Sequence, residues 1–166
     1  LKFISRRKIK KKNYIFCNLN NINKLKYILK SLKVDAVINL VAEVNFLKKT
    51  TDMYNVNSKC PYEIAKYCKK NKIHLIHISG TIVNGIKKTY SKKTKLNPIN
   101  HYGKSKLMGD NLIIKTKCNY TILRLGGIYG KNGPEHLGIN KFIKFALSGK
   151  SQVFKGNKKN LRNYIF

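Results

Sequence analysis

The chain has 166 residues, which is enough for one domain and too few for two domains of ordinary size. It carries 36 lysines and arginines against six acidic residues, a formal net charge of +30, with 42% hydrophobic residues. No apolar run approaches the roughly 18 residues of a membrane span, and the basic N-terminal run does not resemble a secretory signal. We therefore expect a cytoplasmic protein without a membrane partner.

The large positive charge has two interpretations, a nucleic-acid surface or the drift of an AT-rich genome. Nucleic-acid sites rely on arginine for bidentate and stacking contacts. Only four of the basic residues are arginines, and the lysines are spread along the chain among many asparagines and isoleucines. This pattern favours genomic drift, although such a charge predicts non-specific binding to polyanions at low salt.

Cysteines and histidines give no metal motif. The chain has no Cys-x-x-Cys pair, so we expect its four cysteines to be buried free thiols. His74 and His77 fall in a strand-like run, where residues i and i+3 point to opposite faces. No metal site is predicted.

Strands and helices alternate along the chain. Strands are predicted at 1–5, 14–17, 35–42, 73–79, 120–125 and from 162, and helices at 22–32, 52–70, 102–115 and 139–147. Pro61 falls inside the second helix, where we expect it to cause a kink. The alternation predicts an α/β fold with a parallel sheet, and the apolar run Asp35–Ala42 is typical of a strand buried on both faces.

Ligands of parallel sheets bind beyond the carboxyl ends of the strands. The residues expected at that edge are Ser5, Cys17, Asn18, Val41, Ala42, Ser79, Gly80, Gly126 and Gly127. The start of the helix at 102 belongs to the same edge.

Tyr102 and Lys106 stand four residues apart, about one helical turn, so their side chains share a face. An ammonium beside a phenol stabilises the phenolate, and we expect Lys106 to lower the pKa of Tyr102. A tyrosine tuned in this way exchanges a proton with an alcohol or a carbonyl.

Six segments, in order, resemble the extended short-chain dehydrogenase/reductase family, the NAD-dependent epimerase/dehydratase group. They are Cys-Asn-Leu-Asn at 17–20, Asp-Ala-Val-Ile-Asn-Leu-Val-Ala at 35–42, Asn-Val-Asn at 55–57, the block 97–110 around Tyr102, Leu-Arg-Leu-Gly-Gly-Ile-Tyr-Gly at 123–130, and Arg-Asn-Tyr-Ile-Phe at 162–166. The block around Tyr102 is the most specific of them.

The resemblance implies a Rossmann-like, doubly wound parallel sheet, incomplete at both ends, in a single domain over 1–166 whose substrate lobe begins at 151–166. It implies an NAD(P)-dependent epimerase or dehydratase of nucleotide sugars that is a homodimer when full length. Tyr102 would be the acid/base and Lys106 its partner. The cofactor would contact Ser5, Arg6, Asn18, Leu19, Leu40, Val41, Ala42, Asn55, Tyr102, Lys106 and Gly126.

The sequence departs from the family pattern at three places. Gly80 stands where the family has a catalytic Ser or Thr, so Ser79 or Thr81 would have to supply the hydroxyl. The family's Gly-x-x-Gly-x-x-Gly phosphate loop is absent, which suggests a fragment of a longer product. The strand at 1–5 corresponds to the second strand of the family. At its end, Ser5, Arg6 and Arg7 replace the acidic residue of NAD-binding members, which favours NADP.

Two other functions stay open at this point. One is an enzyme similar to dTDP-4-dehydrorhamnose reductases, suggested by Ile38–Ala42 and Asn97–Lys106. The other is a non-catalytic Rossmann remnant that binds nucleotide or RNA, suggested by Gly80 and the missing loop.

Overall fold

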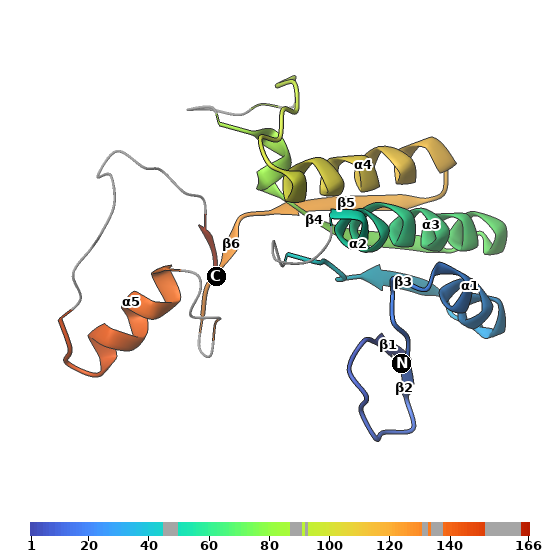
Figure 1. Cartoon of the computed structure of the whole chain (residues 1–166), viewed down its shortest axis with the longest axis horizontal. Coiled ribbons are helices and arrows are strands. Elements are labelled where there is room, and N and C mark those ends of the chain that lie inside the picture. Colours follow the sequence, from blue (N-terminus) through green and yellow to red (C-terminus); the bar gives the residue numbers. More distant parts are fainter. Residues whose placement is uncertain (45–49, 87–90, 92, 131–132, 134–137, 152–163) are drawn as a thin grey trace. The chain divides into compact units, whose positions relative to one another are not determined.

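The computed structural model describes residues 1–44, 50–86, 91, 93–130, 133, 138–151 and 164–166. The chain forms two compact units, Leu1–Arg124 and Leu125–Phe166, which are described separately below (Figure 1). Among the described residues, no helix is both long and apolar enough to cross a bilayer.

The first unit contains two sheets. The strands β1 (Phe3–Ser5) and β2 (Tyr14–Phe16) pair in parallel. A second sheet has the order β3-β4-β5, in which β3 (Ala36–Asn39) pairs in parallel with β4 (His74–Gly80), and β5 (Tyr120–Leu125) lies on the other side of β4. The predicted parallel α/β architecture is therefore confirmed.

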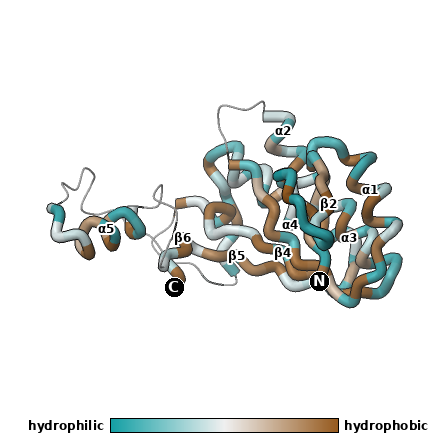
Figure 2. Tube along the Cα trace, turned by 90° about the horizontal axis from the view of Figure 1, so that it is seen from below, coloured by the Kyte–Doolittle hydropathy of each residue, from teal (hydrophilic) through white to brown (hydrophobic). Residues whose placement is uncertain are grey.

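The helices of this unit form one layer. They are α1 (Ile22–Ser31), α2 (Thr50–Tyr54), the π-helical turn η1 (Asn55–Lys59), α3 (Cys60–Asn71), the 3₁₀ turn η2 (Thr81–Asn84) and α4 (His101–Thr116). In this layer α3 contacts both α1 and α4, and α3 and α4 also pack against β4. Figure 2 shows apolar residues concentrated on β4 and β5. The core between these layers includes Leu25, Leu29, Ile64, Leu75 and Ile113, together with the four buried thiols.

The expectation that the strand at 35–42 is buried on both faces is wrong for this structure. Asn39 is buried, but Ile38 and Leu40, which alternate with it, are 61% and 72% exposed. Of the helices, α3 packs against β3, and the alternate side chains Ile38 and Leu40 lie on the opposite face of the strand, where they are open.

The predicted helix at 52–70 is three elements rather than one kinked helix. Pro61 lies in the first turn of α3, where a missing N–H is tolerated. The chain reaches it through η1, whose wider turn is closed by the Cys60 N–H donating to the Asn55 carbonyl.

The second unit contains β6 (Gly127–Ile128), α5 (Gly138–Leu147) and β7 (Tyr164–Ile165). The strands pair in parallel, with Gly127 opposite Tyr164 and Ile128 opposite Ile165, so parts of two segments that resemble the family meet here. Asn140 of α5 accepts from the Gly130 N–H at 3.1 Å and donates to the Ile128 carbonyl at 3.4 Å. The predicted start of a substrate lobe at 151 falls within this unit, and residues 152–163 lie outside the described part.

Candidate functional site

A cavity of about 290 Å³ lies where β1, β2 and β3 end. It is lined by seven residues that were predicted to contact a cofactor, namely Ser5, Arg6, Asn18, Leu19, Leu40, Val41 and Ala42. They come together because the carboxyl ends of parallel strands share one edge. The cavity also takes in Glu43 and Val56, which the sequence had not singled out.

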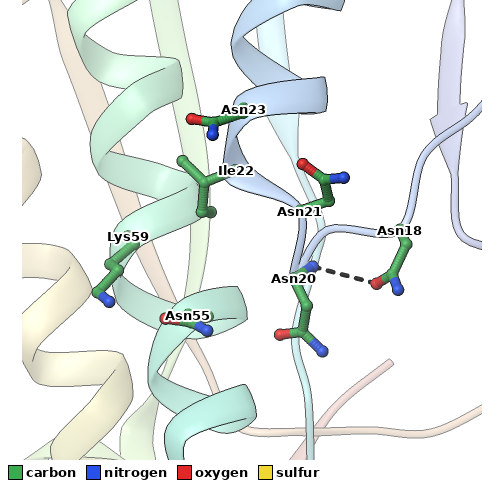
Figure 3. A pocket seen from close by; sticks show the side chains of 7 residues that line it. All are labelled: Asn18, Asn20, Asn21, Ile22, Asn23, Asn55 and Lys59. Carbon is green, nitrogen blue, oxygen red and sulfur yellow. Dashed lines mark hydrogen bonds between the residues drawn. The ribbon is translucent and has the colours of Figure 1, made fainter.

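A second hollow, of about 570 Å³, shares Asn18 and Asn20 with this cavity. Figure 3 shows Asn55 and Lys59 of η1 on one side, and asparagines from the segment that leads into α1 on the other. The Asn20 N–H donates to Asn18 Oδ1 at 3.1 Å. Asn55 therefore lines this hollow rather than the cavity at the strand ends.

The start of α4 is fixed by residues of the Tyr102 block. Asn100 caps the helix, because its Oδ1 accepts from the Gly103 N–H at 2.8 Å. A Cβ on Gly103 would lie 2.8 Å from Pro98 Cβ, so a side chain there would force Pro98 to move. Six residues later, Gly109 lies directly against the Asn57 carbonyl of η1. The helix cap and the two glycines of the block are thus required for the packing around Tyr102.

Tyr102 is half-buried and Lys106 is buried. Lys106 Nζ donates to the Ile78 carbonyl at 2.8 Å, which ties α4 to β4. Burial lowers the pKa of Lys106, and the charge of Asp110 partly opposes this change. Burial raises the pKa of Tyr102 because it desolvates the phenolate, and this direction is opposite to the one predicted.

The two candidate hydroxyl groups have different surroundings. Ser79 is buried and its Oγ donates to Asp110 Oδ2 at 3.1 Å, so it is directed into the protein interior. Thr81 is half-buried in η2, directly after β4. Thr81 is therefore the better placed of the two for contact with a ligand.

A buried polar cluster lies behind Lys106. Asn39 Nδ2 donates to His77 Nδ1 at 3.0 Å, which leaves the proton of the neutral ring on Nε2. Arg124 Nε donates to Asp110 Oδ2 at 3.0 Å. Burial raises the pKa of Asp110 against these hydrogen bonds, whereas burial and the charge of Lys106 lower the pKa of His77 to about 3.

Asn57 connects the cavity to α4. Its Oδ1 accepts from the Glu43 N–H at 2.8 Å, and its Nδ2 donates to the Glu43 carbonyl at 2.9 Å and to Ser105 Oγ at 3.0 Å. Ser105 Oγ in turn donates to the Tyr102 carbonyl at 2.8 Å. We call Glu43, Asn57 and Ser105 the amide clamp. Sequence reasoning selected Asn55 instead, although Asn57 lies in the same motif.

Arg6 and Glu43 form an ion pair across the mouth of the cavity, with Arg6 Nη1 2.8 Å from Glu43 Oε2. The position of Glu43, an acidic residue directly after an apolar strand, was a signal that could have identified it. Gly126, another predicted contact, belongs to the second unit and is not placed relative to this cavity.

The cavity suits the adenosine part of a dinucleotide. Leu19, Val41 and Val56 offer apolar surface for a base, and Ser5 and Asn18 offer hydrogen-bonding groups. Its volume lies near the lower end of the roughly 300–1,000 Å³ of ligand pockets. No glycine precedes Gly80 in the chain, so this sequence offers no glycine-rich loop for a pyrophosphate.

Residues 6–151 match the family described as the RmlD substrate binding domain. Over 95% of its length, the chain is 29% identical to a dTDP-D-glucose 4,6-dehydratase of Dictyostelium discoideum, of which it spans 42%. Among solved structures it resembles the NAD complex of dTDP-glucose 4,6-dehydratase from Bacillus anthracis, with TM-score 0.72 and 24% identity over 93% of this chain and 51% of that one. It also resembles the NAD complex of UDP-glucuronic acid 4-epimerase from Bacillus cereus, with TM-score 0.67 and 26% identity over 83% and 46%. The fold is therefore Rossmann-like, and the chain spans about half or less of these relatives.

Proposed function

The chain belongs to the RmlD substrate-binding-domain family, within the extended short-chain dehydrogenases/reductases, and on that basis we propose that it is the nucleotide-binding part of an enzyme acting on nucleotide sugars. The reaction would be an NAD(P)-dependent epimerisation or dehydration. The observation that carries the proposal is the buried Lys106 one turn after Tyr102, beside the end of β4. Burial of a lysine is costly, and such residues are concentrated at functional sites.

In this proposal, Ser5, Asn18, Leu19 and Val41 hold the adenosine part of NAD(P) in the cavity. A bound nicotinamide would supply the hydride exchange. The Tyr102 hydroxyl exchanges a proton with the sugar oxygen, and Thr81 hydrogen-bonds that oxygen. The Lys106 ammonium, which the Ile78 carbonyl positions, would hydrogen-bond the nicotinamide ribose.

The choice between NAD and NADP has arguments on both sides. Ser5, Arg6 and Arg7 at the end of β1 support the preference for NADP predicted from the sequence. The solved relatives above were crystallised with NAD. The carboxylate of Glu43, which pairs with Arg6, also weighs against NADP. Homodimer formation, a cytoplasmic location and binding to polyanions stay predictions.

The test is conversion of dTDP-glucose or UDP-glucose by the natural chain in the presence of NAD or NADP, with products identified by mass spectrometry. We expect Tyr102→Phe to lose at least about a hundredfold in rate, as is typical for loss of an acid/base group. Tyr27→Phe, at an exposed position of α1, is the matched control and should leave the rate unchanged. Equal rates for Tyr102→Phe and the natural chain would contradict the assignment.

A reductase is the second candidate. The chain is 31% identical, over 64% of its length, to a probable low-salt glycan biosynthesis reductase of Haloferax volcanii. Consumption of NADPH or NADH with a 4-keto nucleotide sugar, without epimerised or dehydrated product, would favour this reaction. If the chain binds adenosine nucleotides but converts no sugar, the non-catalytic alternative is supported. Two features are consistent with it: Gly80 has no hydroxyl, and the Ser79 hydroxyl donates to Asp110.

A further inference from the structure

The Arg6–Glu43 ion pair joins two strand ends that are 37 residues apart in the sequence. Arg6 follows β1 and Glu43 comes shortly after β3, and both line the cavity at the strand ends. Their side chains differ in burial, since that of Arg6 is 56% exposed and that of Glu43 is 4% exposed. The carboxylate is therefore the inner member of the pair.

The amide clamp fixes the position of Glu43. Asn57 bonds both the N–H and the carbonyl of Glu43, at 2.8 and 2.9 Å. The backbone of Glu43 is thus held on both sides, whereas Arg6 has a long and largely exposed side chain. The Glu43 carboxylate is therefore the more fixed member of the pair, and it holds the Arg6 guanidinium at 2.8 Å.

This arrangement bears on which nucleotides the cavity accepts. A buried carboxylate accepts a hydrogen bond from a ribose hydroxyl but repels a phosphate, and its partner guanidinium is already neutralised. Resting on the proposed nucleotide function, we infer that Glu43 is a specificity-determining residue, which favours adenosine with a free 2′-hydroxyl by withholding Arg6 from a 2′-phosphate. Loss of the Glu43 charge releases Arg6 and reverses the preference.

The test measures binding of three probes to the full chain by isothermal titration calorimetry at fixed ionic strength. The probes are 5′-AMP, adenosine 2′,5′-bisphosphate and adenosine 3′,5′-bisphosphate, none of which needs a pyrophosphate loop. The two bisphosphates carry the same charge, so their comparison removes the general attraction of a chain with net charge +30. The variants are Glu43→Gln and the double variant Arg6→Gln/Glu43→Gln.

We expect Glu43→Gln to improve the affinity for the 2′,5′-bisphosphate about tenfold relative to both other probes. The double variant should lose this gain. The matched control is Glu63→Gln, which removes one acidic charge from α3 outside the cavity, and it should change no ratio. An equal gain for both bisphosphates, or no gain, overturns the inference while the nucleotide site stands. Failure of all three probes to bind overturns the proposed function as well.

A single substitution tests the same point if Glu43→Gln does not fold. Because Glu43 already engages Arg6, Arg6→Gln should change the ratio of 2′,5′-bisphosphate to 3′,5′-bisphosphate affinity by less than about threefold. A selective loss of about tenfold or more for the 2′,5′-bisphosphate would show that Arg6 serves the phosphate directly, which contradicts the inference. Circular dichroism of each variant confirms that the comparison is made on folded protein.

Discussion

His77 Nε2 lies 3.7 Å from Asp110 Oδ1, and both side chains are fully buried between β4 and α4. Neither of these two atoms has a hydrogen-bond partner within the described part of the chain. Because Asn39 donates to the other ring nitrogen, the His77 N–H points toward the carboxylate. A small approach of the two side chains would satisfy both groups, so the cluster tolerates a neutral histidine and depends on Asp110.

Removal of the Asp110 charge should destabilise the first unit. Asp110→Asn removes the counter-charge of Arg124 and Lys106 and leaves one carbonyl oxygen in place of the two carboxylate oxygens. We expect the free energy of unfolding to fall by about 3 kcal/mol, as for a buried pair that loses one partner. Urea denaturation measures the change. Asp35→Asn, at an exposed site, should stay within about 0.5 kcal/mol of the natural chain.

Acid should destabilise the chain through His77. Its pKa is lowered to about 3 in the folded state, so between pH 6.5 and 3 the unfolded state binds the extra proton. This contribution to stability is therefore lost as the pH falls, by up to about 1.4 kcal/mol per pH unit. The raised pKa of Asp110 acts in the opposite direction, because the folded state then holds its proton to higher pH.

His77→Gln removes this contribution and should flatten the dependence of the unfolding midpoint on pH. His74→Gln changes the other histidine of β4, whose Nε2 lies 2.9 Å from Thr121 Oγ1 instead. It should keep the acid sensitivity of the natural chain. A parallel pH profile for His77→Gln and the natural chain would contradict the argument.

The amide clamp makes a prediction that separates two neighbouring asparagines. Asn57→Ala removes three hydrogen bonds, two of them to the backbone of Glu43, so we expect a loss of about 3 kcal/mol in unfolding free energy. It should also weaken 5′-AMP binding, since Glu43 lines the cavity. Asn55 is half-buried in the same turn, and Asn55→Ala should lower the free energy of unfolding by less than about 1 kcal/mol. Equal losses for the two variants would count against the clamp.

Two glycines give a matched pair for helix packing. A Cβ on Gly109 would collide with the Asn57 carbonyl, so Gly109→Ala should separate α4 from η1 and cost about 1–3 kcal/mol. Gly138, at the start of α5, has no atom of the described residues within 4 Å of the equivalent position. Gly138→Ala should therefore be neutral or slightly stabilising. Thermal unfolding followed by circular dichroism checks both, and a neutral Gly109→Ala would show that the contact can relax.

The sequence predicted the elements that depend on local pattern and on general rules of parallel sheets. Ser5, Asn18 and Val41 were placed together because strand ends meet at one edge, and the cavity confirms that placement. The bounds predicted for α4 differ from the observed ones by a single residue at each end.

What the sequence did not predict depends on contacts between distant residues. Arg6 and Glu43 pair across the fold, and no local pattern connects them. Lys106 donates to the Ile78 carbonyl, and the pKa of Tyr102 is raised, because both side chains are buried to some degree. The spacing of residues along a helix does not predict this burial. The exposure of Ile38 likewise depends on which face of β3 the helices cover.

The π-helical turn η1 holds one more residue than an α-helical turn of the same length would. Each residue of an α-helix rotates the chain by roughly 100°. Deletion of one residue from this turn would therefore restore an ordinary helix but rotate Asn57 and Ser58 away from α4, and with them the anchor of Glu43. A single-codon deletion at this turn would therefore separate the cavity at the strand ends from Tyr102.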